Sequence, residues 1–285
     1  MITASISPDE YESFREFLED ASGIVLGDNK HYLITSRITR LMTELSIQSF
    51  SELLDRIQGD QRLRHRIMDA MTTNETSWFR DTYPYDFLKE KFFPERAKQS
   101  GELIRVWSAA CSTGQEPYSI SIASNEFMLK NPGMISSDGV QVWGTDISSN
   151  ALQLARAGIY DDVALSRGMS ADLRKRYFRQ EDNRWRVSDD VKKRVNFQEL
   201  NLKTGFASLG KFDIIFCRNV LIYFAPALKA DIMYRMSQSL KPNGYLILGG
   251  SETISGYSED FEILRWKSVG VIYQLKKDKN NRRFA

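Results

Sequence analysis

One short segment combines small residues with a single acid in a way that predicts a ligand site. Residues 105–119 read RVWSAACSTGQEPYS, an apolar strand-like run followed by a loop of small residues and then by a helix. Side chains this small let a ligand lie against the backbone at the end of a strand. Glu116, just before the helix, could then bind hydroxyls or a cation on that ligand. The segment predicts a nucleotide or nucleoside site.

The sequence argues against a ligand held through phosphates. A dinucleotide site needs Gly-x-Gly-x-x-Gly and a P-loop ends in Gly-Lys-Ser/Thr, and the chain has neither pattern. Glu116 would also repel a phosphate. S-adenosylmethionine fits better, because it is a nucleoside with two ribose hydroxyls and a sulfonium cation. Asp146 has the usual ribose-binding position, and Gly114 is interpreted as clearance for this cofactor.

Polar residues follow four predicted strands at the point where each strand ends. These groups are Ser108–Gly114 with Glu116, Gly144–Asp146, Glu199–Leu202 and Cys217–Val220. A single acid in such a place more often caps the next helix than binds a ligand. Because the carboxyl ends of parallel strands meet at one crevice, we expect the four groups to lie together.

Alternating strands and helices from residue 102 onward would position these groups. The predicted strands are Leu103–Ser108, Gln141–Thr145, Val195–Glu199, Phe212–Cys217 and Tyr245–Gly249, and the helices are Glu116–Lys130, Asn150–Ala157 and Pro226–Leu240. Nearly all-apolar strands suit a sheet that is covered on both faces, so we predict a doubly wound α/β sheet. Residues 262–274 read as two strands joined by a tight turn. A mostly parallel sheet ending in an antiparallel hairpin is typical of Rossmann-like class I methyltransferases, whereas dehydrogenases usually continue with parallel strands.

Residues 1–75 are predicted to form a small all-α domain, and residues 76–285 the larger domain. Ser7 and Pro8 followed by acids mark a helix start, and apolar residues recur with helical period between Tyr32 and Leu45. The polar run at residues 71–80 precedes a predicted helix, Tyr85–Arg96, so we expect it to pack rather than to hang free. Residues 158–195 break the alternation and predict a small antiparallel insertion, with Trp185–Val187 and Val195–Phe197 as strands. This insertion is either a loop excursion or a docking element.

Composition excludes several classes of protein. The net charge is +2, but residues 1–75 carry eight Lys and Arg against thirteen Asp and Glu, which argues against a nucleic-acid-binding head there. Cys111 and Cys217 lie in apolar runs and are read as core residues of a reducing compartment. His31 and His65 are far apart, so no metal site is predicted. The first eight residues do not resemble a signal peptide and no apolar run could cross a bilayer, so we expect a cytoplasmic protein.

At these motifs the sequence resembles the chemotaxis receptor methyltransferases, the CheR family, over nearly the whole chain. The matching runs are TTNET at 72–76, FR at 79–80, RVWSAA at 105–110, STGQEPYS at 112–119, DI at 146–147, FDIIFCRNVLIYF at 212–224 and LKPNG at 240–244. The resemblance implies an enzyme that transfers methyl groups from S-adenosylmethionine to glutamate side chains of chemoreceptor signalling domains. The products would be glutamyl methyl esters and S-adenosylhomocysteine.

The resemblance also implies roles for individual residues. The implied cofactor contacts are Asn74, Thr76, Arg80, Glu116, Asp146, Asn201, Leu202, Asn219 and Val220. Arg80 would pair with the carboxylate of the cofactor. Tyr223 is interpreted from its own position: it follows the loop after the fourth strand and either lines the methyl-transfer channel or packs in the core. Arg80 and Tyr223 are the predicted catalytic residues. No general base is needed, because a glutamate with a pKa near 4.3 is already ionised at neutral pH. We expect a monomer without nucleic-acid binding or membrane insertion.

Two departures from the family bear on the receptor. The second helix of the family's front domain carries a row of basic residues that meets the receptor; here Arg37 and Arg40 remain, while Leu41 and Thr43 occupy places where an arginine could stand. Family members that tether to a receptor's C-terminal pentapeptide have a glycine in the insertion's turn. The turn at residues 179–184 has none, so we predict independence from such a tether.

Two other functions stay open at this point. One is a methyltransferase acting on small molecules or RNA with the same sheet, which the acidic front domain disfavours. The other is an adaptor that binds S-adenosylmethionine and a receptor without turnover.

Overall fold

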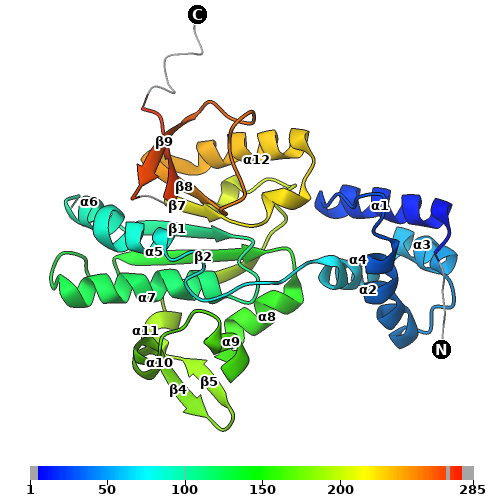
Figure 1. Ribbon diagram of the computed structural model, residues 1–285, viewed down its shortest axis with the longest axis horizontal. Coiled ribbons are helices and arrows are strands. Elements are labelled where there is room, and N and C mark those ends of the chain that lie inside the picture. Colours follow the sequence, from blue (N-terminus) through cyan, green and yellow to red (C-terminus); the bar gives the residue numbers. More distant parts are fainter. Residues whose placement is uncertain (1–5, 100, 268–269, 278–285) are drawn as a thin grey trace, which may run out of the picture.

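The computed structural model describes residues 6–99, 101–267 and 270–277, and its centre is a seven-stranded sheet (Figure 1). The strand order is β6-β2-β1-β7-β8-β10-β9. The first five of these strands run parallel, and β10 pairs antiparallel with β8 and with β9. The predicted mostly parallel sheet with a C-terminal antiparallel hairpin is confirmed. The turn of that hairpin, residues 268–269, lies outside the described residues. Residues 1–5, at the start of the chain, lie outside them as well.

The strands of this sheet follow the predicted ones closely. They are β1 (Ile104–Ala109), β2 (Val140–Asp146), β6 (Val195–Glu199), β7 (Phe212–Cys217), β8 (Leu240–Leu248), β9 (Phe261–Trp266) and β10 (Gly270–Leu275). β8 begins five residues earlier than predicted, because its first part pairs with Phe212 and the register then shifts between Phe212 and Ile214. The Pro-Asn-Gly sequence at 242–244 is typical of a turn, but here it lies within β8 at this irregularity.

Helices cover both faces of the sheet, as the apolar strands indicate (Figure 1). On one face α12 (Pro226–Ser239) packs its Ile232 and Met233 against Trp107 and Ile215. On the other, α7 (Gln115–Lys130) and the helical stretch before β1 pack against Val106 and the remaining strand side chains. That stretch consists of α5 (Tyr83–Phe87), a π-helical turn (Leu88–Phe92) and α6 (Phe93–Ala97). The wide turn immediately precedes Pro94, whose ring is incompatible with a regular α-helix at this point.

Four helices form the N-terminal part, which stands beside the sheet (Figure 1). They are α1 (Pro8–Ser22), α2 (His31–Glu44), α3 (Phe50–Gly59) and α4 (Gln61–Met71). α1 begins at the predicted helix start, where Ser7 and Glu10 form a capping box and Pro8 stands in the first turn. The apolar stripe of α2 is buried among the other helices, except that Leu45 ends the helix as its C-cap.

The insertion differs from the prediction in its strands. Its small antiparallel sheet has the order β3-β5-β4, formed by β3 (Ile159–Tyr160), β4 (Phe178–Glu181) and β5 (Arg184–Val187). The short helices α9 (Asp162–Ser166), α10 (Ala171–Tyr177) and α11 (Asp189–Lys192) accompany it. Val195–Phe197 does not belong to it: these residues are part of β6, which pairs with β2 at the edge of the main sheet. The turn between β4 and β5 is only two residues long, with Asp182 at a φ of 50°.

The described residues contain no helix with both the length and the apolar character that a membrane span requires.

Candidate functional site

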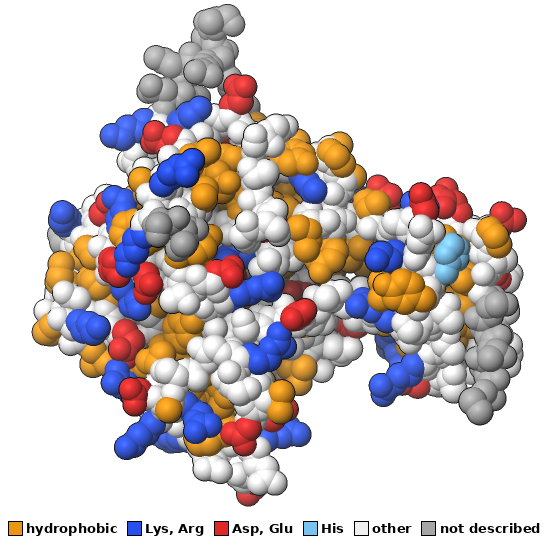
Figure 2. Space-filling model, in the orientation of Figure 1, with side chains coloured by type: hydrophobic (Ala, Val, Ile, Leu, Met, Phe, Trp, Pro, Cys, Tyr) orange, Lys and Arg blue, Asp and Glu red, His pale blue; other side chains and the backbone are white. Residues whose placement is uncertain are grey.

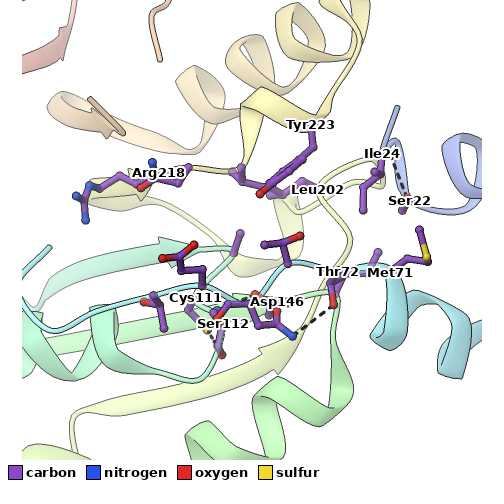
Figure 3. A pocket seen from close by; sticks show the side chains of 18 of the residues that line it. Ser22, Ile24, Met71, Thr72, Cys111, Ser112, Asp146, Leu202, Arg218 and Tyr223 are labelled. Atoms are coloured by element: carbon purple, nitrogen blue, oxygen red, sulfur yellow. Dashed lines mark hydrogen bonds between the residues drawn. The ribbon is translucent and has the colours of Figure 1, made fainter. Parts of the chain in front are cut away.

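One cavity gathers the polar strand ends and the N-terminal helices around a common space (Figure 3). It occupies about 1150 Å³, including its open mouth. All nine predicted cofactor-contacting residues line it: Asn74, Thr76, Arg80, Glu116, Asp146, Asn201, Leu202, Asn219 and Val220. Tyr223 and Arg37 line it as well, whereas Arg40 does not. The residues that the sequence analysis grouped as cofactor contacts therefore line one cavity. Their contacts with a cofactor stay a prediction.

The topology of the sheet explains why these residues meet. The connection from β1 leads to β2 on one side and the connection from the neighbouring strand β7 leads to β8 on the other, so a crevice opens between the carboxyl ends of β1 and β7. The loop after β1 contributes Ala110, Cys111 and Ser112 to the cavity. Ala110 and Ser112 have left-handed backbone conformations (φ 57° and 51°), which turn the chain tightly between strand and helix. The small residues do place the backbone at the cavity wall, as predicted.

Gly114 has a different role from the one predicted. It is not among the residues that line the cavity. A Cβ atom at this position would lie 2.9 Å from the Cβ of Ala155 and 3.1 Å from the hydroxyl of Tyr160. The glycine, at a φ of 94°, thus lets the insertion and α8 (Ser149–Ala157) pack closely against the loop. Its interpretation as clearance for the cofactor is wrong.

Asp146 ends β2 with its carboxylate held by backbone donors. The N–H of Ser112 donates to Oδ2 (2.7 Å) and the N–H of Ser148 donates to Oδ1 (2.9 Å). Burial raises the pKa of Asp146 above its ordinary value, although these two N–H donors act in the opposite direction. The carboxylate is therefore fixed in orientation, and each oxygen keeps lone pairs for hydroxyl donors.

Glu116 is paired inside the protein rather than free. Ser108 Oγ donates to its Oε1 (2.7 Å), and Arg218 Nη1 lies 2.7 Å from its Oε2. The Arg218 side chain is 2% exposed and that of Glu116 is 11% exposed. Burial acts to lower the pKa of Arg218, but its neighbours Glu116, Tyr85 and Asp81 together outweigh burial and the pKa is raised. The acid that was expected to repel phosphate is thus largely neutralised by a partner that sequence reasoning missed.

Arg218 connects the ends of β1 and β7 to the segment before α5. Its Nη2 donates to the carbonyl of Arg80 (2.9 Å) and to Asp81 Oδ2 (2.6 Å), while its Nε has no hydrogen-bond partner within the described residues. Three residues around Arg80 have left-handed conformations: Phe79, Asp81 and Thr82, with φ of 47°, 66° and 52°. Such strain persists only where the surroundings impose it. Arg218 is one of the groups that impose it.

Glu252 shapes the loop after β7 and was also missed. Its two carboxylate oxygens accept hydrogen bonds from five backbone N–H groups, those of Asn219, Val220, Leu221, Ile222 and Gly249. The loop carries two of the predicted cofactor residues and ends in a 3-10 turn, Leu221–Tyr223. Asn219 has a φ of 59°, which a carboxylate receiving its N–H helps to maintain. The only sequence signal was an acid after the small residues at 249–251.

The linker segment, residues 72–80, lines the cavity beside the loop after β1, where the carbonyl of Asn74 accepts the hydroxyl of Ser112. The ring of Trp78 is buried against the insertion, edge-on to Tyr160 and Phe178. The backbone N–H of Trp78 donates to the carbonyl of Arg167. The segment packs, as predicted. Its polar side chains nevertheless have few protein partners: Arg80 makes one hydrogen bond of 3.4 Å, and so does the amide of Asn74. These groups are available to a ligand.

The end of β6 joins the cavity to the N-terminal helices. Asn201 Nδ2 donates to the carbonyl of Ala21 (2.8 Å), close to the end of α1. Lys203 contacts the same helix end through Asp20. Leu202 is buried among the side chains under α12. Asn201 is thus a docking contact between the two parts of the chain as well as a lining residue.

Tyr223 points into the cavity from the wall opposite Asp146 and Ser112 (Figure 3). Its backbone carbonyl accepts the N–H of Val25 (2.8 Å), and Ile24 bridges to Phe224. The loop after α1 therefore closes this side of the cavity. Tyr223 is half-buried beside the core, and its phenol faces the space where a ligand would lie.

Arg37 and Arg40 lie on the same helix but in different surroundings. Arg37 Nη1 donates to the carbonyl of Met71 (2.6 Å), next to the linker segment. Arg40 is 87% exposed and pairs with Glu44 on the surface (3.1 Å). Only Arg40 offers a fully exposed charge to a partner.

The donor set fits a nucleoside with charged and hydroxyl groups. A buried carboxylate (Asp146), a guanidinium with few partners (Arg80) and apolar residues such as Leu202 and Ile147 share one space. In the described ranges, no three or more His, Cys, Asp and Glu residues are arranged to hold a metal ion. The cavity can thus bind and orient a ligand of this kind.

Two family models match the chain in succession. The all-alpha domain of CheR methyltransferases matches residues 9–72, and the SAM binding domain of CheR methyltransferases matches residues 74–269. The second match contains all nine predicted cofactor-contacting residues, from Asn74 to Val220.

Full-length relatives agree with these models. Chemotaxis protein methyltransferase Cher2 of Pseudomonas putida is 49% identical over 94% of this chain and 98% of its own. Chemotaxis protein methyltransferase 1 of Pseudomonas aeruginosa is 48% identical, with the same coverages. The chemotaxis protein methyltransferase of Vibrio parahaemolyticus is 48% identical over 97% of this chain and 100% of its own. Among solved structures, a TehB-like SAM-dependent methyltransferase of Corynebacterium glutamicum has a TM-score of 0.38 and 12% identity over 69% of this chain and 97% of that one, a likeness too distant to support a conclusion.

Proposed function

Because this chain belongs to the CheR methyltransferase family, we propose that it methylates glutamate side-chain carboxylates of chemoreceptors to give glutamyl methyl esters. The enzyme class and the cofactor follow directly from the family: the chain is an S-adenosylmethionine-dependent methyltransferase with a class I sheet. The observation that carries the finer proposal is the near-complete coverage of relatives named chemotaxis protein methyltransferases.

The chemistry asks the protein to position rather than to exchange protons. S-adenosylmethionine supplies an electrophilic methyl group. A glutamate acceptor with an ordinary pKa near 4.3 is ionised at neutral pH, so no side chain has to deprotonate it. The remaining tasks are in-line alignment and exclusion of water. The contacts of Val25 and Ile24 with residues 223–224 close one side of the cavity and serve the second task.

Individual roles follow from charge and geometry. Asp146, fixed by two backbone donors, would accept the ribose hydroxyls. Arg80, with a single long hydrogen bond, would hold the carboxylate of the cofactor, for which a guanidinium is suited. Asn74 and Thr76 on the linker segment, and Glu116, Asn201, Leu202, Asn219 and Val220 elsewhere, would complete the cofactor contacts. One carboxylate oxygen of Glu116 would already be paired with Arg218 when the cofactor binds.

Tyr223 would line the channel through which the methyl group passes. Its ring points into the cavity (Figure 3), which supports the proposal. The expected result for Tyr223→Phe is a lower turnover number at saturating cofactor and receptor, with unchanged S-adenosylhomocysteine affinity. Full turnover in that variant would remove Tyr223 from the reaction.

The N-terminal helices would choose the acceptor. Acidic side chains gather along the outer edge of this part, over α1, while basic side chains lie nearer the larger body (Figure 2). A receptor bundle that presents glutamates would approach the basic side. Arg40 on α2 is exposed, and Arg37 was predicted with it as a receptor contact. We propose a cytoplasmic monomer that does not bind nucleic acid.

The insertion would act without a receptor tether. Its β4–β5 turn is two residues long and contains no glycine, unlike the turn of family members that hold a receptor's C-terminal pentapeptide. We expect no calorimetric binding of such a pentapeptide at micromolar concentration. Measurable heat of binding in that range would contradict this part of the proposal.

One assay separates the proposed function from its alternatives. Purified enzyme is incubated with radiolabelled S-adenosylmethionine and receptor signalling domains, and the products are treated with base. Label on receptor that is released as methanol identifies methyl esters. Label that survives base identifies methylated amines or bases, as for a small-molecule or RNA methyltransferase. Cofactor binding without transfer would identify an adaptor.

A further inference from the structure

Arg37 is turned toward the interior of the site, although it lies on the helix that would face the receptor. Its Nη1 donates to the carbonyls of Met71 (2.6 Å) and Thr72 (3.3 Å), and its Nη2 donates to Thr73 Oγ1 (3.1 Å). Three consecutive residues of the chain are thus bound by one guanidinium. The same side chain lines the cavity.

The bound residues are the last residue of α4, Met71, its C-cap, Thr72, and the residue after it, Thr73. The last carbonyls of a helix have no partner within the helix and carry its partial negative charge. α4 has no basic residue in its own last turn. Arg37 supplies the missing cation from α2, and in doing so it fixes the direction in which the chain leaves the helix at Met71.

That direction determines where the linker segment enters the cavity. Asn74 follows immediately, and its carbonyl accepts the hydroxyl of Ser112 (3.0 Å) in the loop after β1. The far end of the segment is fixed by buried Trp78. Between these two anchors, the side chains of Asn74 and Thr76 face the cavity with almost no protein partners. The near anchor therefore sets their position.

We propose that Arg37 is a positioning residue for the cofactor, which acts by holding residues 71–73 so that Asn74 and Thr76 face the methyl donor. Arg40, three residues further along α2, has none of these contacts and pairs only with surface acid. The two arginines of this helix thus divide their work: Arg37 serves cofactor binding and Arg40 serves the receptor. The inference rests on the proposed cofactor contacts of Asn74 and Thr76.

The test measures S-adenosylhomocysteine binding by calorimetry on the full chain without receptor. We expect Arg37→Ala to weaken binding about tenfold or more, the scale of lost hydrogen bonds to a charged group. Arg40→Ala, the matched control, should bind within about twofold of the unchanged protein, since exposed pairs contribute little. Arg37→Lys keeps the cation but not the two-nitrogen geometry, so its loss should be intermediate. Unchanged affinity in both Arg37 variants would overturn the proposal.

Steady-state kinetics add a readout that a purely structural role would not move. Arg37→Ala should raise the KM for S-adenosylmethionine and leave the KM for receptor unchanged, whereas Arg40→Ala should do the reverse. A raised receptor KM with unchanged cofactor affinity would assign Arg37 to the receptor instead. Circular dichroism establishes folding, and if Arg37→Ala is unfolded, Arg37→Lys decides the question by the same criteria. Calorimetry measures the effect of Arg37 on cofactor binding even if no receptor glutamate is methylated. The proposal for Arg37 and the proposed glutamate methylation can therefore be refuted independently.

Discussion

The two walls of the cavity differ in how their polar groups are satisfied. On the sheet wall, formed by the ends of β1, β2 and β7, the charged groups already have protein partners: Glu116 binds Arg218 and Ser108, and Asp146 accepts two backbone N–H groups. On the linker wall, residues 72–80, Arg80 and Asn74 make only single long hydrogen bonds.

This difference separates two functions of polar residues in one site. A group whose partners belong to the protein contributes to folding, and its loss leaves another buried group unpaired. A group without protein partners costs folding little and is available to a ligand. Substitutions on the sheet wall should therefore lower stability first, and substitutions on the linker wall should lower cofactor affinity alone.

The largest expected effect is that of Arg218→Met. This change leaves Glu116 and Asp81 without their buried cation, and breaking such a pair by removing one partner costs about 3–5 kcal/mol of unfolding free energy. Urea denaturation measures it. Arg40→Ala, which removes only a surface pair, serves as the control and should change stability by less than about 1 kcal/mol. Equal unfolding free energies of the two variants would contradict a stabilising role of the sheet wall.

Arg80→Ala should show the opposite pattern. Loss of the proposed partner of the cofactor carboxylate should weaken S-adenosylhomocysteine binding by about 1.5–3 kcal/mol, the range for hydrogen bonds to charged groups. Its unfolding free energy should stay within about 0.5 kcal/mol, as for most exposed positions. Calorimetry and urea denaturation on the same preparation check both. A stability loss larger than the affinity loss would place Arg80 with the sheet wall.

Glu252→Gln tests whether the backbone of the sheet wall affects cofactor binding, because Glu252 binds that backbone but does not line the cavity. Glutamine keeps one acceptor oxygen but turns an NH₂ group toward N–H donors, such as those of Asn219 and Gly249. We expect a loss of about 0.5–1.5 kcal/mol in unfolding free energy, on the scale of one hydrogen bond, together with weaker cofactor binding. If only stability changes, the loop after β7 does not need this support to bind the cofactor.

The smallest effect concerns pH. Burial raises the pKa of Asp146 above its ordinary value of 3.8, so the folded protein holds this proton more tightly than the unfolded chain. The contribution of this group to unfolding free energy therefore increases as the pH falls through the raised pKa, and it is unfavourable above it. Binding of ribose hydroxyls to the ionised form should follow the opposite trend and weaken as the pH falls. Calorimetry between neutral pH and the acid range, with Asp146→Asn as the pH-insensitive reference, checks the sign.

The sequence predicted the parts of the site that depend on local pattern. Strands such as Phe212–Cys217 are apolar runs, and their polar ends had to meet at one edge of a parallel sheet. It did not predict contacts that join distant segments: Arg218 and Glu116 are 102 residues apart, and no periodicity marks them as partners. Gly114 was misread for the same reason, since its neighbours Ala155 and Tyr160 come from later elements.

The insertion shows a second limit. Val195–Phe197 has the composition of a short strand, but composition does not say which sheet a strand joins. Pairing with β2 places it at the edge of the main sheet, and β3 supplies the third strand of the small one. With only two paired residues, β3 is too short to leave a periodic signal.

The anchoring of Trp78 has a consequence for synthesis of the chain. The N-terminal helices leave the ribosome first, yet the far end of the linker segment beside them is fixed by contacts of Trp78 with Tyr160, Arg167 and Phe178, which are made later. The wall that carries Tyr223 needs residues 218–223, and Glu252 after them. Until about nine-tenths of the protein has been made, the nascent chain has its N-terminal helices but not the complete cavity. The cavity can therefore form only late in synthesis.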